Sequence, residues 1–428
     1  MKDRLISLIH QANPWLADPS EQISLKSYIP RLQAPQLLSP EWDTLWLVLV
    51  GPRQAGKTTL AKYLAQQLIA QKRFQTLLYL NCDLLEIRQW LTSPLFIKEA
   101  MDEFQLENPI ILIDEVQRLE NPGLLLKACA DLSLNIKMMA TGSSQLEIKS
   151  KVQEYLTGRH LEVTVFPLSY LELGRVEETS LIYGCYPAVV KSAEKAILLQ
   201  QIYQDYIHKD IIELLRVSKP DVMQKLITLL AHSSGQLVNY NQLATDCLVP
   251  VTTIRSYLAI LEYTYVIARV TPFVGNKRKE ITSNPVFYFI DNGFRNQSLH
   301  NLSAMEGRQD IGLLTQSALF QELFKFKTQN FYDMTIHFWR TMSGAEVDFV
   351  LYKNQECIIP IEMKFRAMNK PTVSRSFRSF IEAYQPRYGF FITKDFNKKI
   401  NVGNCQVHFI SFSKLLRLFE ILTDVLAA

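Results

Sequence analysis

The segment GPRQAGKTT, at residues 51–59, constrains the fold of this chain more than any other feature. It fits the pattern G-x-x-x-x-G-K-[ST], whose fixed positions hold Gly51, Gly56, Lys57 and Thr58. An apolar run, LWLVLV (45–50), precedes it, and a stretch with apolar residues at helical spacing (57–74) follows it. A loop between a buried strand and a helix turns its backbone N–H groups toward phosphate oxygens. This context favours a nucleotide-binding loop over a chance glycine-rich turn.

The residues of this loop have expected roles in holding a nucleotide. Their backbone is expected to surround the phosphates of ATP: Gly51, Pro52, Arg53, Gln54, Ala55, Gly56, Lys57, Thr58 and Thr59. The Lys57 ammonium is suited to bridge the β and γ phosphates, and the Thr58 hydroxyl is suited to hold Mg²⁺. ATP and Mg²⁺ are therefore the expected cofactors.

An acidic pair lies in PIILIDEVQRL, at residues 109–119. Four apolar residues precede Asp114, which is then expected to stand at the C-terminal end of a buried strand and to bind Mg²⁺ through water. Glu115 follows directly, and a carboxylate there can orient and polarise the attacking water as a general base. A helix cap is the simpler interpretation of an acidic pair alone. The buried strand and the upstream phosphate loop favour the catalytic interpretation here.

Two further polar positions leave alternatives open. KMMATGSS (137–144) ends in hydroxyl groups, and either Ser143 or Thr141 can sense the γ-phosphate or cap a turn. Arg159 is suited to be an arginine finger, because a guanidinium offsets charge in the transition state, or to form a plain surface salt bridge. A finger that serves a neighbouring active site would point to a homo-oligomer.

The order of strand-like and helical segments predicts the fold class. Strand-like runs at 76–83, 110–115 and 135–144 alternate with helical segments, which indicates a parallel sheet with helices on both faces. VFPLSYLELG (165–174) interrupts the alternation, and mostly helical sequence follows to about residue 265. Paired strands are expected around a basic loop at 265–273 and 285–291. A separate α/β unit is expected beyond residue 310, with a helix at 312–328, strands at 334–339, 345–352 and 357–364, a helix at 371–385 and a strand at 388–393.

Composition adds bounds rather than a function. The 428 residues suggest about three domains. The formal net charge of +4 permits a nucleic-acid partner without demanding one. Six scattered cysteines form no CxxC pair, which argues against a zinc site or a disulfide framework and favours buried free thiols. The apolar runs are shorter than the roughly 20 residues that span a bilayer, and the N-terminus does not fit a signal peptide, so no membrane partner and a cytoplasmic location are expected.

Taken in order, these and further segments resemble a large prokaryotic ATPase family. The resemblance is carried by GPRQAGKTTL, IDEVQRL, TGSS, GRHLEVTVFPLSYLEL, YGCYP, YIHKDI, FYFIDNGFRN and GAEVDFVL followed by IPIEMK. The family belongs to the AAA-like branch of P-loop NTPases, and its C-terminal half resembles the restriction-endonuclease, or PD-(D/E)xK, fold. The resemblance covers nearly the whole chain from about residue 40. It implies an ATPase domain, a winged-helix-like middle and a nuclease-like end.

The middle segment is expected to hold a helix, a second helix, a turn and a third helix. Asn239 is suited to cap the second helix, and Thr252 or Thr253 to cap the third, while Tyr257 is expected to face outward. A winged helix would use FVGNKRKEITSNP (273–285) as its wing, where a basic cluster can contact DNA phosphates: Lys277, Arg278 and Lys279. The alternatives are a protein connector and a solvated basic loop.

The C-terminal acids are candidates for a metal-dependent nuclease. Asp348 lies in one predicted strand, and Glu362 and Lys364 lie on the same face of the next. Two carboxylates can hold Mg²⁺, and a lysine can position or activate water. Glu322, on the preceding helix, is expected to supply a further ligand. The simpler interpretation is a pair of amphipathic strands, but Glu362 and Lys364 follow a continuous apolar run, where a buried strand does not normally host charges.

These expectations define domains and two functional hypotheses. The expected domains are a helical lead-in (1–43), an AAA-like ATPase domain (44–175), a helical connector (176–222), a winged-helix-like domain (223–295) and a PD-(D/E)xK nuclease-like domain (296–428). The first hypothesis is an ATP-hydrolysing protein that acts on nucleic acid, with a nuclease-like domain gated by nucleotide state. The alternative is a regulatory ATPase switch whose winged helix and inert nuclease-like domain bind DNA or a protein without cleavage.

Overall fold

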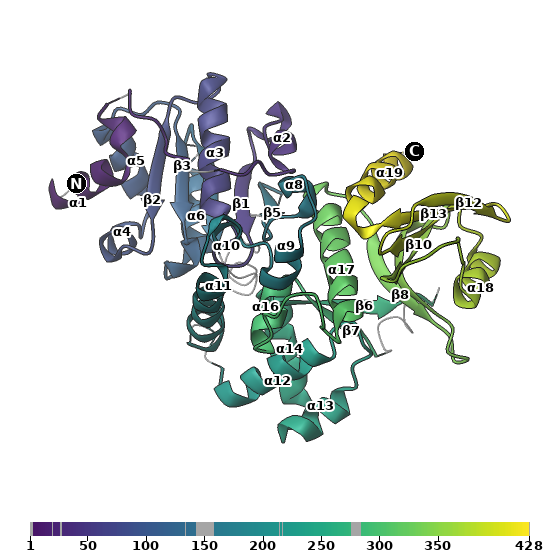
Figure 1. Ribbon diagram of the computed structural model, residues 1–428. Coiled ribbons are helices and arrows are strands. Elements are labelled where there is room, and N and C mark those ends of the chain that lie inside the picture. Colours follow the sequence, from purple (N-terminus) through teal and green to yellow (C-terminus); the bar gives the residue numbers. More distant parts are fainter. Residues whose placement is uncertain are drawn as a thin grey trace. The chain divides into compact units, whose positions relative to one another are not determined.

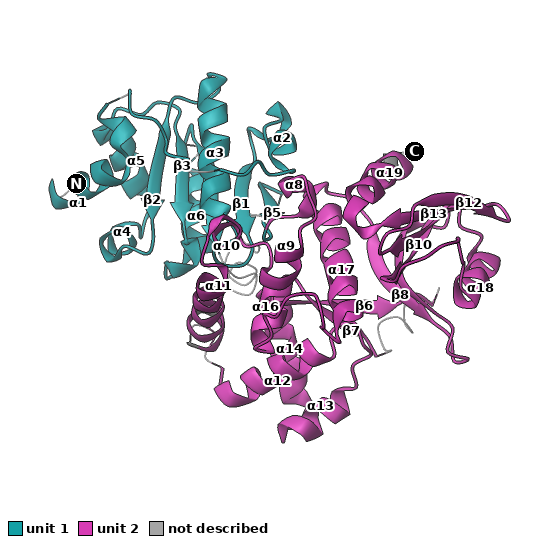
Figure 2. Ribbon diagram, in the orientation of Figure 1, with its two compact units in different colours: residues 1–167 teal, residues 168–428 magenta. Residues whose placement is uncertain are grey.

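The computed structural model describes residues 3–18, 20–25, 28–132, 134–142, 158–213, 215, 217–274 and 284–427. The chain divides into two compact units, Met1–Pro167 and Leu168–Ala428 (Figures 1 and 2). No helix within the described ranges is long and apolar enough to cross a membrane. The two units are described separately below.

The first unit is built on a five-stranded parallel sheet with the order β2-β3-β4-β1-β5. Its strands are β1 (Trp46–Val50), β2 (Leu77–Asn81), β3 (Ile110–Asp114), β4 (Lys137–Gly142) and β5 (His160–Thr164). The predicted parallel sheet is therefore confirmed. The sequence did not predict β5, because this strand lies at the edge of the sheet and its side chains are mostly only half-buried, so it has no continuous apolar run.

Helices of the first unit surround this sheet (Figure 1). They are α1 (Asp3–Ala12), η1 (Pro14–Leu16), α2 (Ala34–Leu37), η2 (Pro40–Trp42), α3 (Lys57–Ala70), α4 (Leu85–Trp90), α5 (Pro94–Glu103), η3 (Val116–Arg118) and α6 (Pro122–Asp131). The apolar face of α3, which includes Leu60, Leu64 and Leu68, shares one core with Leu49 of β1 and Leu112 of β3. This packing holds the first turn of α3 at the carboxyl end of β1.

The N-terminal segment is part of the first unit and extends the edge of the sheet. The Asn13 side chain pairs with the backbone of Tyr79 in β2: its Nδ2 donates to the Tyr79 carbonyl at 2.9 Å, and its Oδ1 accepts from the Tyr79 N–H at 2.6 Å. An amide side chain thus replaces a neighbouring strand along part of β2. The predicted boundary at residue 43 stays a prediction.

The second unit contains an eight-stranded sheet with the order β12-β13-β11-β10-β9-β8-β6-β7. The strands are β6 (Ile267–Pro272), β7 (Val286–Phe289), β8 (Thr335–Arg340), β9 (Glu346–Asn354), β10 (Cys357–Lys364), β11 (Tyr388–Thr393), β12 (Lys398–Val402) and β13 (Cys405–Ser411). β6 pairs antiparallel with β7 and parallel with β8. The sheet therefore runs from the middle segment into the C-terminal segment. The predicted boundaries within this unit stay predictions.

Helices of the second unit lie on and beside that sheet. They are α8 (Tyr170–Leu173), α9 (Glu178–Tyr183), α10 (Pro187–Lys191), α11 (Lys195–Gln204), the π-helix η5 (Asp205–Glu213), α12 (Pro220–His232), α13 (Tyr240–Cys247), α14 (Val251–Tyr263), α16 (Asn292–Ser298), α17 (Ile311–Gln329), α18 (Arg375–Tyr384), η6 (Phe412–Lys414) and α19 (Leu416–Ala427). The chain order α17, β8, β9, β10, α18, β11 follows the expected order of elements beyond residue 310. β12, β13 and α19 were not predicted.

The middle segment tests the capping predictions. Asn239 caps α13 as expected, because its side chain accepts from the backbone N–H groups of Asn241 and Gln242. The cap of α14 is Pro250 rather than either of the two threonines, because the helix begins at Val251. Tyr257 does not face outward: it is buried, and its hydroxyl accepts from the Lys219 N–H at 2.9 Å.

Candidate functional site

The phosphate loop has the strained backbone that its glycines allow. Gly51 has φ +140° and Gly56 has φ +99°. A Cβ atom at Gly51 would lie 2.2 Å from the Val165 carbonyl oxygen, so no larger residue fits where the chain leaving β5 passes the loop. The loop then enters α3 at Lys57. The backbone N–H groups of this first turn have no partner within the helix and can bind an anion.

Lys57 and a residue that the sequence did not single out hold the loop in shape. The buried Lys57 ammonium donates to the carbonyl oxygens of Gly51 and Pro52, both at 2.9 Å. Arg31, also buried, donates to the Phe166 carbonyl at 2.9 Å and to the Ala55 carbonyl. No local sequence signal marks Arg31, because the loop that it supports is remote in the sequence.

The carboxylate of Asp114 accepts hydrogen bonds from hydroxyl groups on three elements, α3, β2 and β4. The Thr58 hydroxyl donates to Asp114 Oδ1 at 2.7 Å, and the Tyr79 hydroxyl donates to Oδ2 at 2.9 Å. The Thr141 hydroxyl at the end of β4 also donates to Oδ1. Burial, with the charge of Asp114, raises the pKa of Tyr79 well above its usual value, which keeps its hydroxyl a donor. Tyr79 is a second residue that the sequence did not identify.

Glu115 follows Asp114 in the left-handed backbone region, with φ +54°. Its N–H donates to the Thr141 hydroxyl at 3.1 Å, and its carboxylate accepts from the Gln117 side chain. Burial raises the pKa of Glu115, while Lys57 opposes that shift. A raised pKa suits a carboxylate that takes a proton from water.

The remaining expected residues near this site have different outcomes. Ser143 lies outside the described residues, whereas Thr141 stands beside Asp114 and Glu115. Arg159 forms an exposed salt bridge with Asp131, at 2.7 Å. This contact matches the simpler of its two interpretations, and its role as an arginine finger stays a prediction.

The residues present fit ATP and Mg²⁺. Because there is no room for a side chain at Gly51, the backbone of the loop forms the wall of the site at this position. The Thr58 hydroxyl and the Asp114 carboxylate lie together at its mouth, and Mg²⁺ prefers oxygen ligands of this kind. Lys57, Thr58 and Asp114 would hold the phosphates and the metal ion.

The second group of candidate residues lies where β9 and β10 pair antiparallel, with Ile361 opposite Phe349. Asp348 Oδ2 accepts from the Met363 N–H at 2.7 Å, and Oδ1 accepts from Gln316 Nε2 at 3.0 Å. Both carboxylate oxygens are thereby fixed in direction. Burial, with the charge of Glu362, raises the pKa of Asp348 to about 7. Gln316, on α17, was not identified from the sequence.

Glu362 and Lys364 contact each other directly. The Lys364 ammonium lies 2.7 Å from Glu362 Oε1. Oε2 accepts from the hydroxyl of Ser374, which caps α18. Burial opposes the charge of Lys364, but Glu362 and Asp348 outweigh it and raise its pKa. Asp348, Glu362 and Lys364 therefore form one electrostatic group.

The prediction that Glu322 joins this group is wrong. Its buried carboxylate accepts from the Tyr170 N–H at 2.7 Å and lies 3.5 Å from the ammonium of Lys325. Glu322 follows Gln316 by six residues, and at about 100° per residue it points to a different side of α17. No group of three or more His, Cys, Asp or Glu side chains in the described part of the chain is arranged to hold a metal ion.

YGCYP and FIDNGFRN, two motifs that carry the family resemblance, contact each other in the protein core and take no part in either candidate functional site. Asp291 Oδ2 accepts from the Cys185 N–H at 2.8 Å, and Oδ1 accepts from the Gly293 N–H at 2.9 Å. A Cβ atom at Gly184 would lie 1.9 Å from Asp291 Oδ1. YGCYP and FIDNGFRN thus form a structural joint between α9 and α16.

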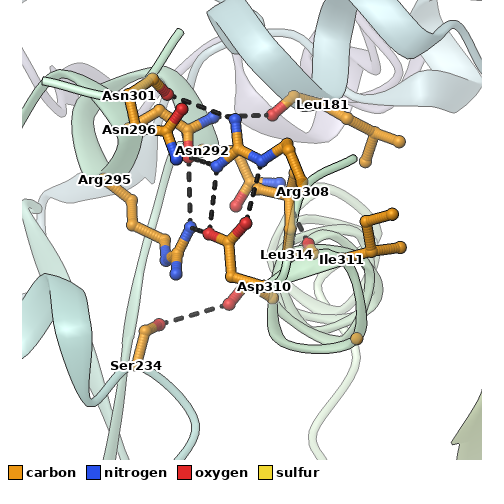
Figure 3. Close-up of polar contacts among 12 residues, drawn as sticks. Leu181, Ser234, Asn292, Arg295, Asn296, Asn301, Arg308, Asp310, Ile311 and Leu314 are labelled. Carbon is orange, nitrogen blue, oxygen red and sulfur yellow. Dashed lines mark hydrogen bonds and ion pairs between the residues drawn. The ribbon is translucent and has the colours of Figure 1, made fainter. Parts of the chain in front are cut away.

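A polar network beyond this joint anchors the start of α17 (Figure 3). Arg308 donates to both oxygens of Asp310, at 2.8 and 3.0 Å, and Arg295 donates to Oδ2 at 2.8 Å. Both arginine side chains are almost fully buried. Asn296 accepts from each arginine at 3.1 Å. The network fixes the residues that lead into α17.

The family models match the chain in three consecutive segments. Residues 43–174 match the model described as an AAA domain. Residues 177–306 match a domain of unknown function, DUF8612, and residues 311–413 match another, DUF4143. The first segment contains the phosphate loop, Tyr79, Asp114, Glu115 and Thr141, while Arg31, which supports the loop, precedes it.

Curated relatives extend the similarity over most of the chain. An uncharacterized protein of Haemophilus influenzae is 27% identical over 346 residues, which are 74% of this chain and 82% of that protein. An uncharacterized protein of Mycobacterium tuberculosis is 25% identical over 380 residues, which are 87% of this chain and 82% of that protein.

Solved structures show weaker likeness. Caenorhabditis elegans PCH-2 is 19% identical with a TM-score of 0.24, over 37% of this chain and 43% of that chain. A DNA replication initiation factor is 15% identical with a TM-score of 0.28, over 54% of this chain and 74% of that chain. TM-scores this low say nothing of how the whole chain is built. The phosphate loop and the Thr58–Asp114 pair lie within residues 43–174, the segment that matches the AAA-domain model, and they support an AAA-like P-loop ATPase in that segment.

Proposed function

We propose that this protein hydrolyses ATP to control an action on nucleic acid, and that its C-terminal segment is a metal-dependent nuclease-like domain. The observation that carries the second part is the grouping of Asp348, Glu362 and Lys364 on two adjacent strands. Two carboxylates can hold a divalent cation and a lysine can position water, so this grouping suits metal-assisted phosphodiester hydrolysis.

In the ATPase site, each side chain has a role that its contacts support. Lys57, which now donates to two carbonyl oxygens, would instead bind phosphate oxygens, and Thr58 and Asp114 would hold Mg²⁺. Glu115 accepts a proton from the attacking water, and its raised pKa favours this. If Arg159 acts as a finger, it does so after leaving Asp131, and it then completes the site of a second copy of the chain.

The order of helices and strands in the middle segment supports the proposal that this segment contacts DNA. A helix (α12), a bridge between Leu237 and Val286, two helices (α13 and α14) and a hairpin (β6 and β7) follow one another, as in a winged helix. The basic cluster at Lys277, Arg278 and Lys279 follows β6 and precedes β7 in the sequence, and it lies outside the described residues.

In the C-terminal segment, the helix–strand–strand–strand–helix–strand order supports the PD-(D/E)xK proposal. Asp348 and Glu362 would hold Mg²⁺, which supplies Lewis acidity and a more acidic bound water. Lys364, charged beside Glu362, positions that water or stabilises the developing charge.

The test is incubation of the purified full chain with plasmid, single-stranded DNA and RNA. Each substrate is assayed with and without ATP and with Mg²⁺ or Mn²⁺. We expect metal-dependent cleavage whose rate changes with nucleotide, and its loss in Asp348→Ala and Lys364→Ala. Full cleavage by both variants would remove these residues from the chemistry.

A second candidate is a regulatory ATPase whose C-terminal domain binds without cutting. It is favoured by the protein partners of Glu362: Lys364 occupies Oε1 and Ser374 occupies Oε2, so a metal ion has to compete with both. This function predicts that Asp348→Ala leaves ATP turnover and nucleic-acid affinity unchanged and that no substrate is cut under any condition.

A further inference from the structure

Asp348 lines a pocket whose other lining residues were not predicted as site residues from the sequence. The pocket has a volume of about 480 Å³. Its walls come from the α12–α13 turn, β7, α17, β8 and β9, and include Gln236, Tyr288, Gln316, Phe338, Arg340 and Asp348. The turn and β7 belong to the middle segment. One side of the pocket beside the Asp348 carboxylate is therefore formed by the middle segment and not by the C-terminal segment.

The wall on the side of the middle segment is held closely against Asp348. Gly235 packs so tightly that a Cβ atom there would lie 3.1 Å from the Tyr288 ring and 3.3 Å from Gln316 Oε1. The same Gln316 donates to Asp348. Next to it on α17, Ser317 hydrogen-bonds Ser234 at 3.2 Å. The turn is therefore fixed to the helix that orients the carboxylate, and the pocket is a built feature of the second unit.

Arg340 supplies a cation at the edge of this pocket. It lies opposite Glu346 in the register of β8 and β9, and its side chain is exposed. Among the described residues, the Arg340 side chain forms no ion pair or hydrogen bond, so its guanidinium N–H groups can bind a phosphate. Glu346 and Asp348 add two carboxylates to the same walls. These two charges oppose a phosphate group, and a divalent cation held by Asp348 and Glu362, as proposed above, would offset them.

The size of the pocket limits what can reach Asp348. Its volume is in the range of about 300–1,000 Å³ that single small-molecule-sized groups fill. One nucleotide fits this range, but a double helix, whose major groove alone is about 12 Å wide, does not. Enzymes that act on a nucleotide in such a pocket use a single strand or extrude the nucleotide from the duplex.

We propose that this pocket binds one unpaired nucleotide of a single-stranded nucleic acid, with Arg340 contacting its phosphate, so that the phosphodiester at Asp348 belongs to a single strand. The proposal rests on the nuclease-like function proposed above and names its substrate class. DNA and RNA strands share the chemistry that the pocket recognises, and the experiment separates them.

The test compares labelled single strands of DNA and RNA with the matching DNA duplex, in Mg²⁺ or Mn²⁺, using the full chain. We expect at least about tenfold faster cleavage of a single strand than of the duplex, since the duplex must first be opened. Arg340→Ala should raise KM for the single strand by about 10- to 100-fold, the range for a lost charge-assisted hydrogen bond. Arg340→Lys should retain part of the affinity.

Arg387→Ala is the matched control, because Arg387 is exposed and does not line this pocket. Equal rates on single strand and duplex, or an Arg340→Ala variant that matches wild type, would overturn the proposal. If no nucleic acid is cut although ATP is hydrolysed, the proposed nuclease function fails. The proposed pocket is then tested separately by measuring its affinity for a single strand. A fluorescein-labelled single strand in Mn²⁺ should then bind Arg340→Ala more weakly than wild type, and equal affinities would reject the pocket.

Discussion

At the scale of single residues, Asp114 shows how the ATPase site is assembled. Its carboxylate accepts hydrogen bonds from Thr58, Tyr79 and Thr141, which lie on a helix and two strands. Thr58 and Thr141 lie next to the carboxyl end of the parallel sheet, where such sheets bring distant residues together, and the Tyr79 hydroxyl reaches the same carboxylate from the middle of β2. The site therefore depends on the order of strands in the sheet as well as on the phosphate loop and the acidic pair.

The roles of Lys57 and Glu115 can be separated by measuring ATP hydrolysis and ATP binding in variants of each residue. We expect Lys57→Ala to lose ATP turnover by at least about 100-fold, because phosphate charge is no longer offset. Glu115→Gln should bind ATP normally but lose turnover by about 100- to 10,000-fold, because the amide takes no proton from water. ATP hydrolysis and nucleotide-binding measurements on the purified variants check both. Lys98→Ala, at an exposed position, is the control, and undiminished turnover in Glu115→Gln would remove Glu115 from the base role.

Asp310 leads to a prediction about acid stability. Hydrogen bonds from Arg308, together with Arg295, hold the pKa of Asp310 at about 2, below its usual value of 3.8. A lowered folded-state pKa contributes stability above the unfolded value, and this contribution is lost as pH falls from about 4 through about 2. Asp310→Asn should lower the free energy of unfolding at pH 7 by on the order of 2 kcal/mol. Urea unfolding at several pH values checks this, and the difference from wild type should shrink toward pH 2. A difference that is constant with pH would contradict the assignment.

At the scale of elements, α17 connects the parts of the second unit. Gln316 reaches Asp348, Ser317 reaches Ser234, and Gln321 donates to the Phe289 carbonyl and to Asn292. The helix is buried on several sides, so its apolar residues do not form one stripe. This is why the sequence predicted the helix but placed Glu322 on the wrong side of it.

The joint between α9 and α16 gives a matched pair of glycine substitutions. Gly184→Ala should destabilise the chain by about 2–4 kcal/mol, because φ is +74° and the new Cβ would meet Asp291. Gly312→Ala, in the first turn of α17 with nothing within 4 Å, should be neutral or stabilise by up to about 1 kcal/mol. Thermal and urea unfolding of both variants test this contrast. Equal effects of the two substitutions would mean that the contact with Asp291 does not matter.

At the scale of the whole molecule, an AAA-like ATPase domain is joined to a unit in which the middle and C-terminal segments share one sheet. β6 belongs to the hairpin of the middle segment and also pairs with β8 of the C-terminal segment. A partner bound at the middle segment, as proposed above, would therefore contact a sheet that also carries Asp348 and Glu362. If the proposed nuclease function holds, this continuous sheet is a path by which partner binding and cleavage would influence each other.

The basic cluster between β6 and β7 provides the prediction at this scale. Replacing Lys277, Arg278 and Lys279 with Ala should weaken DNA binding and make log affinity less dependent on log salt, because up to about three phosphate contacts are lost. Anisotropy titrations over a range of salt concentrations measure both. If neither affinity nor slope changes, the middle segment is better described as a protein connector. ATP turnover without DNA should be unchanged and serves as the control.

The nucleotide site was largely predictable because its signals are local. The phosphate loop follows a fixed spacing, and the run before Asp114 identifies a buried strand, so both were found from neighbouring residues alone. Asn239 was predicted as a cap for the same reason. Arg31, Tyr79 and Gln316 were missed because each acts on a residue that is remote in the sequence.

By itself, the sequence determined the phosphate loop, the parallel sheet of the first unit and the pairing of Glu362 with Lys364 on one strand face, since all follow from spacing and apolar runs. Only the tertiary structure decided that Glu322 pairs with Lys325, that Gln316 orients Asp348 and that the middle segment walls the pocket beside it. The physical reason is that helical spacing tells which residues share a face but not which neighbour that face meets. That choice is made by packing among segments that lie far apart along the chain.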